Sequence, residues 1–230
     1  MISPTITMSE ARSSASGRSP APSFAHEDSA RMAGYSRIAG ADEAGRGCLA
    51  GPVVAAAVML PARLRIRGVR DSKLLDHHAR ERLAQRIESR ALTFAYGICT
   101  VDEIDDLNIL RASLLAMRRA LAQLTPQPDF VLVDGNQAIH PLPVPQQTVI
   151  DGDALSHAIA AASVLAKVKR DAIMRSLDND FPGYGLADHK GYATRAHIEA
   201  IKALGPAACH RRTFRLTGRD ALQAGLFANA

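Results

Sequence analysis

Hydrophobic and polar positions take on a regular order from about Tyr35 onward. A short apolar segment over residues 37–43, a glycine-rich turn and a nearly continuous apolar run over residues 51–60 predict two strands joined as a hairpin. The further expected elements, in chain order, are a helix capped by Asp76 and running to about residue 90, a strand over 92–100, a helix from Asp102 to about Leu121, a strand over 130–133, a strand over 148–150 and a helix from Asp153 to about Leu177.

The order of these elements, with a hairpin first and strands alternating with helices later, predicts one mixed sheet covered by helices. The fold class is therefore an α/β or α+β sandwich. The preceding segment differs, because residues 1–33 are rich in Ser, Ala and Pro and lack sustained apolar periodicity. We expect residues 1–33 to form a disordered arm.

The composition narrows the class of protein. The chain has 230 residues, of which 47% are hydrophobic, enough for one substantial core. No stretch approaches the roughly 20 apolar residues of a membrane span, and the N-terminal arm lacks the apolar run of a signal peptide, so we expect a cytoplasmic protein that binds no membrane. Cys48, Cys99 and Cys209 form no paired pattern, which argues against a disulfide framework or a zinc site.

The formal net charge of +5 favours polyanionic partners. The basic residues gather in three groups, which are Arg63, Arg65, Arg67, Arg70 and Lys73, then Lys167, Lys169 and Arg170, and then Arg211, Arg212 and Arg215. Any one group is equally well explained as a solvated surface. The charge therefore indicates a class of partner without locating the contact.

Four acidic residues lie at the ends of expected strands or just after them: Asp42, Glu43, Asp134 and Asp153. Strand ends meet at one edge of a sheet, so these carboxylates are candidates to converge. Together they would repel one another unless cations neutralised them, and an all-oxygen ligand set suits Mg²⁺ or Mn²⁺ better than zinc. Two such ions about 4 Å apart are a known arrangement for phosphodiester hydrolysis.

Two points keep this interpretation open. Acidic residues near strand ends are often only turn formers or helix caps. In addition, adjacent strand residues point to opposite faces, so Asp42 and Glu43 reach one site only if the strand bends or ends there, for which Gly45 and Gly47 offer the freedom.

Residues 42–47 read Asp-Glu-Ala-Gly-Arg-Gly, which resembles a signature of the bacterial ribonuclease HII family, the type 2 ribonucleases H. Further segments resemble motifs of this family in the same order: Asp71-Ser72-Lys73, Val133-Asp134-Gly135-Asn136, Gly152-Asp153, residues 161–168, His189-Lys190-Gly191-Tyr192 and residues 210–214. The resemblance covers the chain from about Tyr35 to Arg215. It implies an RNase H-like, mixed five-stranded sheet flanked by helices, with a helical C-terminal extension, in a catalytic domain over residues 34–216 followed by a tail over 217–230.

The resemblance also implies an activity. Members of the family are metal-dependent endonucleases that hydrolyse the RNA strand of RNA–DNA hybrids and incise 5′ to ribonucleotides embedded in duplex DNA, leaving 3′-hydroxyl and 5′-phosphate ends. It makes Asp42, Glu43, Asp134 and Asp153 the ligands of two divalent ions, Mg²⁺ or Mn²⁺. The assignment of Asp153 rather than Asp151 rests on the alignment of Gly152 and the helix that follows it.

The resemblance gives roles to residues that spacing leaves unassigned. The loop of Gly45, Arg46 and Gly47 is expected to recognise the ribonucleotide 2′-OH largely through its backbone, and the ring of Tyr192 to pack on the next sugar. Phosphate contacts are expected from the following three side chains: Lys190, Arg46 and Lys73. Without the resemblance, Tyr192 would be an ordinary half-buried aromatic residue and each cation an ordinary surface charge.

A motif in the tail suggests a protein partner. Gln223, Leu226 and Phe227 resemble the QxxLF peptide with which bacterial replication proteins bind the sliding clamp, although the same apolar residues suit the inner face of a terminal helix. A monomer is expected. Two alternatives to the whole assignment are another nuclease of the same fold and a non-catalytic module that binds RNA–DNA hybrids.

Overall fold

The computed structural model describes residues 22–69 and 75–214. Its helices are α1 (Ala25–Met32), α2 (His77–Glu88), α3 (Val101–Leu107), α4 (Ile109–Ala122), α5 (Gly152–Leu155), α6 (His157–Asp180), α7 (Leu186–His189) and α8 (Arg195–Leu204). Its strands are β1 (Ile38–Ala44), β2 (Val53–Met59), β3 (Thr93–Cys99), β4 (Phe130–Asp134) and β5 (Gln146–Val149). Lys73 and the tail with Gln223, Leu226 and Phe227 lie outside the described residues.

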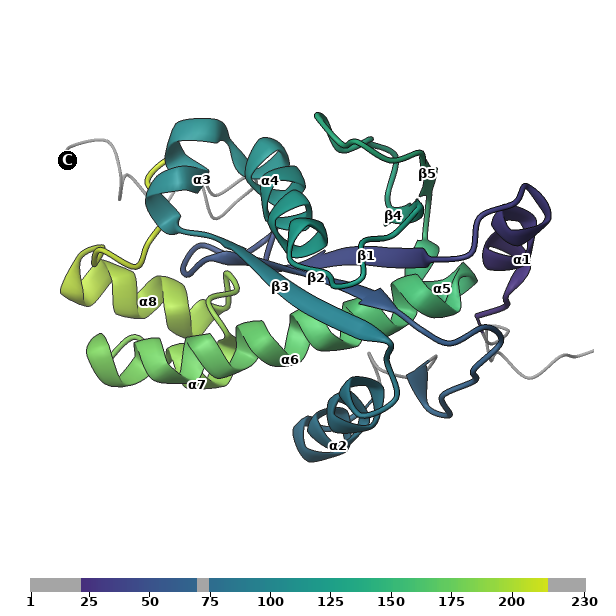
Figure 1. The fold of residues 1–230 in the computed structure, drawn as a ribbon. Helices are drawn as coiled ribbons and strands as arrows, with labels where there is room; N and C mark the ends of the chain where they lie inside the picture. The colour runs from purple at the N-terminus through teal and green to yellow at the C-terminus, as the bar shows by residue number, and fades with distance from the viewer. Residues whose placement is uncertain (1–21, 70–74, 215–230) are drawn as a thin grey trace, which may run out of the picture.

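The strands form one mixed sheet in the order β3-β2-β1-β4-β5. Strand β2 pairs antiparallel with both β1 and β3, whereas β1 with β4 and β4 with β5 are parallel. Helices α3 and α4 cover one face, and α6 with α2 covers the other (Figure 1). This arrangement confirms the expected five-stranded α/β fold, and α7 and α8 form the expected helical C-terminal extension.

Small residues allow α6 to approach the sheet closely. The inward positions of β1 and β2 are mostly alanine and valine, and a Cβ atom added at Gly40 of β1 would overlap the backbone of Ala158 in α6. Close approach of a helix to a strand requires this absence of side-chain volume. The packing brings the polar side chains of α6 against the end of β1, where the candidate acidic residues lie.

Two helices expected to be continuous are interrupted. The helix expected from Asp102 to about Leu121 is divided at Asn108, which has φ of +68° and accepts a hydrogen bond from the Arg111 N–H to begin α4. The helix expected from Asp153 to about Leu177 is divided at Ser156, whose side chain caps α6. Asparagine and serine stabilise helix beginnings through such side-chain acceptors, and the apolar periodicity did not reveal these breaks.

The expectation of a disordered arm over residues 1–33 is wrong for its last part, because α1 occupies Ala25–Met32. Glu27 is 4% exposed, and its Oε1 accepts hydrogen bonds from the Ser156 hydroxyl at 2.8 Å and from the Ala158 N–H at 2.9 Å. The N–H of Ser23 donates to the Leu155 carbonyl. These contacts anchor α1 on the junction of α5 and α6 through tertiary partners that local composition cannot show.

We predict that Glu27→Ala lowers the free energy of unfolding by about 1 to 3 kcal/mol, because it leaves two buried donors at the start of α6 without their acceptor. Urea denaturation followed by circular dichroism measures the change. The control is Asp28→Ala on the same helix, whose ion pair with Arg63 is partly exposed and should contribute less than about 1 kcal/mol. Equal losses in the two variants would contradict the anchoring role of Glu27.

Within residues 22–69 and 75–214, no helix combines the length and apolar character that crossing a membrane requires.

Candidate active site

Two acidic residues are brought together by neighbouring parallel strands. The register of β1 and β4 pairs Ala41 with Val133, so Asp42 and Asp134 are the next residues on the two strands, at the same edge of the sheet. Strand β1 continues to pair with β2 through Ala44, without the distortion that the adjacent carboxylates led us to expect. The pairing of β1 with β4 ends at Ala41, before Asp42. The absence of paired residues beyond this point leaves room at the sheet edge for the side chains of Asp42 and Asp134.

Asp42 is the most enclosed of the acids, with 6% of its surface exposed. One carboxylate oxygen accepts a hydrogen bond from the Glu43 N–H at 2.7 Å, and the hydroxyl of Ser163 in α6 also donates to this side chain. Burial raises the pKa of Asp42 well above its usual range, and the negative charges of Glu43 and Asp134 raise it further. A buried acid with two acidic neighbours favours a cation in its vicinity.

Glu43 has a side chain that is 7% exposed, and Arg46 Nη1 donates to its Oε1 at 3.1 Å. Burial raises the pKa of Glu43, the charge of Arg46 opposes the increase, and Asp134 adds to it. Both Asp42 and Glu43 therefore interact with Asp134 although they are adjacent in one strand.

Asp134 connects this pair to the fourth acid. Its Oδ1 accepts a hydrogen bond from the Gly152 N–H at 2.8 Å, at the start of α5. Burial raises the pKa of Asp134, the N–H of Gly152 opposes the increase, and the charge of Asp153 adds to it. Asp153 lies in the first turn of α5, whereas Asp151 is exposed and has a left-handed backbone with φ of +53°.

The structure thus brings Asp42, Glu43 and Asp134 close enough for their negative charges to repel one another, and it places Asp153 near Asp134. Within the described ranges, no three His, Cys, Asp or Glu side chains are arranged as a formed metal site. The donor chemistry nevertheless fits a hard divalent cation, because all four groups are carboxylates, and three of them have pKa values raised by burial and mutual repulsion. A bound cation would relieve this repulsion.

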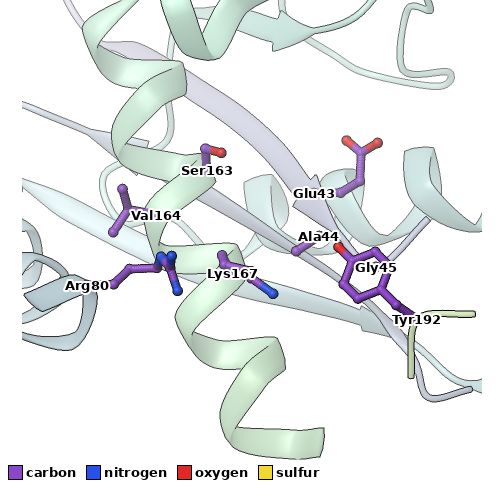
Figure 2. A pocket seen from close by; sticks show the side chains of 8 residues that line it. All are labelled: Glu43, Ala44, Gly45, Arg80, Ser163, Val164, Lys167 and Tyr192. Atoms are coloured by element: carbon purple, nitrogen blue, oxygen red, sulfur yellow. The ribbon is translucent and has the colours of Figure 1, made fainter. Parts of the chain in front are cut away.

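A cleft of about 360 Å³ lies beside Glu43, one of these acids, and is lined by the end of β1, by α6 and by Tyr192. Figure 2 shows the Glu43 carboxylate and the Tyr192 ring near the end of β1, with Lys167 extending from α6 toward the ring. The Lys167 ammonium lies 5.6 Å from the centre of that ring, and Tyr192 is 44% exposed. An exposed aromatic ring with a cationic side chain beside it suits a sugar–phosphate backbone.

The loop that follows β1 lies at the same end of the strand. Gly45 has φ of +103°, which is accessible to glycine at little cost, and the next two residues, Arg46 and Gly47, are exposed. An isolated antiparallel bridge joins Cys48 to Tyr192. The loop and the tyrosine are therefore held together although 145 positions separate Gly47 from Tyr192 in the numbering.

Lys190 is less free to contact a substrate phosphate than the sequence led us to expect. Its ammonium donates a hydrogen bond to the Ala187 carbonyl, its own carbonyl accepts one from Arg170, and burial lowers its pKa.

Ser163 and Lys167 line the cleft, yet sequence reasoning gave neither a role. The one available signal was their position in the segment over residues 161–168, where polar side chains interrupt an otherwise apolar helix.

Comparison with known proteins agrees with this geometry. The profile of the family Ribonuclease HII matches residues 39–217. Ribonuclease HII of Syntrophotalea carbinolica is 54% identical over 182 residues, covering 79% of this chain and 87% of the relative. Ribonuclease HII of Moorella thermoacetica is 53% identical over 192 residues, covering 84% of this chain and 93% of the relative.

Solved structures show the same fold. Ribonuclease H2 from Pyrococcus horikoshii OT3 superposes with a TM-score of 0.68 at 25% identity, over 82% of this chain and 96% of that one. RNase HII from Archaeoglobus fulgidus, solved as a PCNA:RNase HII complex, superposes with a TM-score of 0.64 at 27% identity, over 80% of this chain and 98% of that one. With the sequence relatives, these matches argue against a non-catalytic binding module. This chain belongs to the ribonuclease HII family and is a metal-dependent endoribonuclease.

Proposed function

We propose that this endoribonuclease hydrolyses the RNA strand of RNA–DNA hybrids and incises duplex DNA on the 5′ side of an embedded ribonucleotide, leaving 3′-hydroxyl and 5′-phosphate ends. The observation that carries the proposal is that the mutually repelling acids, the loop after β1 and the exposed Tyr192 ring all lie around one strand end. Chemistry on a phosphodiester and recognition of the adjacent sugar can then occur on one surface.

Asp42, Glu43, Asp134 and Asp153 are the residues that would hold two divalent ions, Mg²⁺ or Mn²⁺. Such ions supply activation of the attacking water and neutralisation of the charge on the leaving oxygen. The protein itself orients the ligands: the Ser163 hydroxyl and the Glu43 N–H hold Asp42, and the Gly152 N–H holds Asp134. The negative charge of Asp153 acts on Asp134, which supports Asp153 rather than Asp151 as the fourth ligand.

The remaining residues recognise the substrate. In this proposal, the backbone of Gly45, Arg46 and Gly47 contacts the ribonucleotide 2′-OH, the group that distinguishes RNA from DNA. The Tyr192 ring packs against the following sugar, where a deoxyribose fits best because it lacks the 2′-OH. The phosphate contacts come from Arg46, Lys190 and Lys73, and Lys190 must exchange its hydrogen bond to the Ala187 carbonyl for one to the phosphate. The Lys167 ammonium, which forms an ion pair with Asp171, lies beside the Tyr192 ring.

The test is cleavage of a duplex DNA that contains one ribonucleotide, in the presence of Mg²⁺, Mn²⁺ or EDTA. We expect a single incision on the 5′ side of the ribonucleotide with either metal and none in EDTA. Asp153→Asn should abolish cleavage and Asp151→Asn should leave it intact. Cleavage of long hybrids without incision at the single ribonucleotide would contradict the finer specificity, and loss of activity only in Asp151→Asn would contradict the ligand assignment.

We also propose that the tail binds a replication sliding clamp through Gln223, Leu226 and Phe227. The solved PCNA:RNase HII complex from Archaeoglobus fulgidus supports a partner of this kind. Deleting residues 223–230 should remove co-elution with the clamp without lowering activity on short duplexes, and unchanged co-elution would overturn the proposal. Gel filtration, which detects this co-elution, also tests our expectation that the protein is a monomer. Fractionation of cells tests the expected cytoplasmic location of the protein.

A further inference from the structure

Two arginines lie entirely inside the protein beneath the loop that follows β1. Arg170 of α6 and Arg211 of the C-terminal segment are both 0% exposed. Among the described residues, neither guanidinium forms an ion pair with a carboxylate. A buried charge without a counterion is costly unless its donors are all satisfied, so these side chains require an explanation.

Backbone carbonyls satisfy Arg211. Its Nη2 donates to the carbonyls of Gly45 and Gly51 at 2.8 Å each, its Nη1 donates to the Arg46 carbonyl at 3.1 Å, and its Nε donates to the Gly51 carbonyl at 3.0 Å. The Phe214 ring centre lies 5.0 Å from the guanidinium carbon. The edges of this planar group therefore bind the loop while one face contacts an aromatic ring.

Arg170 acts on the adjoining part of the same structure. Its Nε donates to the Pro52 carbonyl at 3.0 Å, its Nη2 to the Ala50 carbonyl at 3.0 Å and its Nη1 to the Lys190 carbonyl at 2.9 Å. Lys190 lies two positions before Tyr192. One arginine thus connects the loop end to the segment that carries the exposed tyrosine ring.

The orientation of the carbonyls determines that of the amides. In a planar trans peptide the C=O and the following N–H point in opposite directions. The carbonyls of Gly45 and Arg46 point inward to Arg211, so the N–H groups of Arg46 and Gly47 point away from it, and both of these residues are exposed. The positive charge on the carbonyl side also polarises the two peptide units, which strengthens their N–H groups as donors.

We propose that Arg211 is a positioning residue for ribonucleotide recognition: it turns the amides of Arg46 and Gly47 toward the substrate and polarises them, with Arg170 fixing the loop end relative to Tyr192. The inference rests on the proposed function, in which this loop contacts the 2′-OH. The substitution Arg211→Lys keeps the charge, but a lysine ammonium cannot reach three carbonyls in one plane, so the orientation of the two amides should be lost.

The experiment compares binding to two duplexes of the same sequence, one with a single ribonucleotide and one of DNA alone. Both are measured in Mg²⁺ with the full-length Asp134→Asn protein, which should not cleave. Two hydrogen bonds to the 2′-OH predict about a tenfold preference for the ribonucleotide duplex. Adding Arg211→Lys should remove this preference and leave the affinity for the DNA duplex unchanged. Adding Arg212→Lys, at the exposed neighbouring position, should change neither.

The outcomes are distinguishable. No preference in the Asp134→Asn parent would count against 2′-OH recognition itself, and with it against the proposed function. A preference in the parent that survives Arg211→Lys would overturn the role of Arg211. A general loss of affinity for both duplexes in a folded Arg211→Lys protein would also overturn it, because a merely structural role predicts that result.

Hydrogen exchange provides a second test that does not depend on the folding of a protein substituted at Arg211. In the Asp134→Asn protein, the amides of Arg46 and Gly47 should exchange rapidly when free, since they point away from Arg211 toward solvent. They should be protected by the ribonucleotide duplex and much less by the DNA duplex. Slow exchange in the free protein, or equal protection by the two duplexes, would overturn the inference.

Discussion

Replacing Asp42 with asparagine should reduce metal-dependent cleavage about a thousandfold or more, since a metal ligand contributes several kcal/mol of transition-state stabilisation. Asparagine retains one oxygen that can accept the hydrogen bonds of Ser163 and Glu43, so the local structure should persist. Single-turnover cleavage of a duplex with one ribonucleotide measures the loss. Asp151→Asn is the matched control, because Asp151 is an exposed acid near the same site and should retain full activity.

The same substitution should stabilise the protein when no metal is present. The pKa of Asp42 is raised in the folded state, so the folded protein binds protons more tightly than the unfolded chain does. The resulting stability is fully present below the unfolded pKa of about 4 and is lost as the pH rises through the raised folded pKa. In EDTA, the melting temperature of the wild type should therefore fall relative to that of Asp42→Asn as the pH increases from about 4 to neutrality.

Addition of Mg²⁺ should reverse this difference, because an ion that binds only the folded wild type stabilises it by mass action. The wild type should gain more in melting temperature than Asp42→Asn at neutral pH. If the melting temperatures of the two proteins in EDTA differed by the same amount at every pH, the buried charge of Asp42 would already be compensated without a cation.

Gly45→Ala should destabilise the protein by roughly 2 to 5 kcal/mol, the sum of backbone strain and overpacking. The backbone at Gly45 has φ of +103°, and an added Cβ would overlap the guanidinium of Arg170, which is fully buried and held by three carbonyls. The side chain of Arg170 therefore cannot yield without breaking those hydrogen bonds. Urea denaturation measures the loss.

Gly47→Ala is the matched comparison, because an added Cβ at Gly47 meets no atom within 4 Å in the described structure. Its stability should change by less than about 0.5 kcal/mol. The added methyl group should nevertheless obstruct the approach of the substrate sugar, and a displacement of about 1 Å corresponds to roughly a hundredfold loss in kcat/KM. Full activity of Gly47→Ala would show that the substrate does not approach this part of the loop.

The sequence by itself determined the elements whose signals are local. The apolar run over residues 51–60 predicted β2, Asp76 predicted the beginning of α2 and does cap it, and the order of strands and helices predicted a mixed sheet with helices on its faces. These predictions succeed because side-chain periodicity and capping depend on residues within one turn or one strand. Local signals also marked the acidic residues as candidates, since each lies near the end of a predicted strand, and in the structure Asp153 lies in the first turn of α5.

Only the tertiary structure decided which charges are exposed and which are buried. In the sequence, Arg170 and Arg211 belong to basic groups that suggest a polyanion-binding surface, yet both are 0% exposed in the structure. The carbonyls that satisfy Arg211 lie as far as 166 positions away in the chain. An arginine can be buried only where such acceptors converge, and no local pattern records that convergence, just as none records the docking of Glu27 on the start of α6.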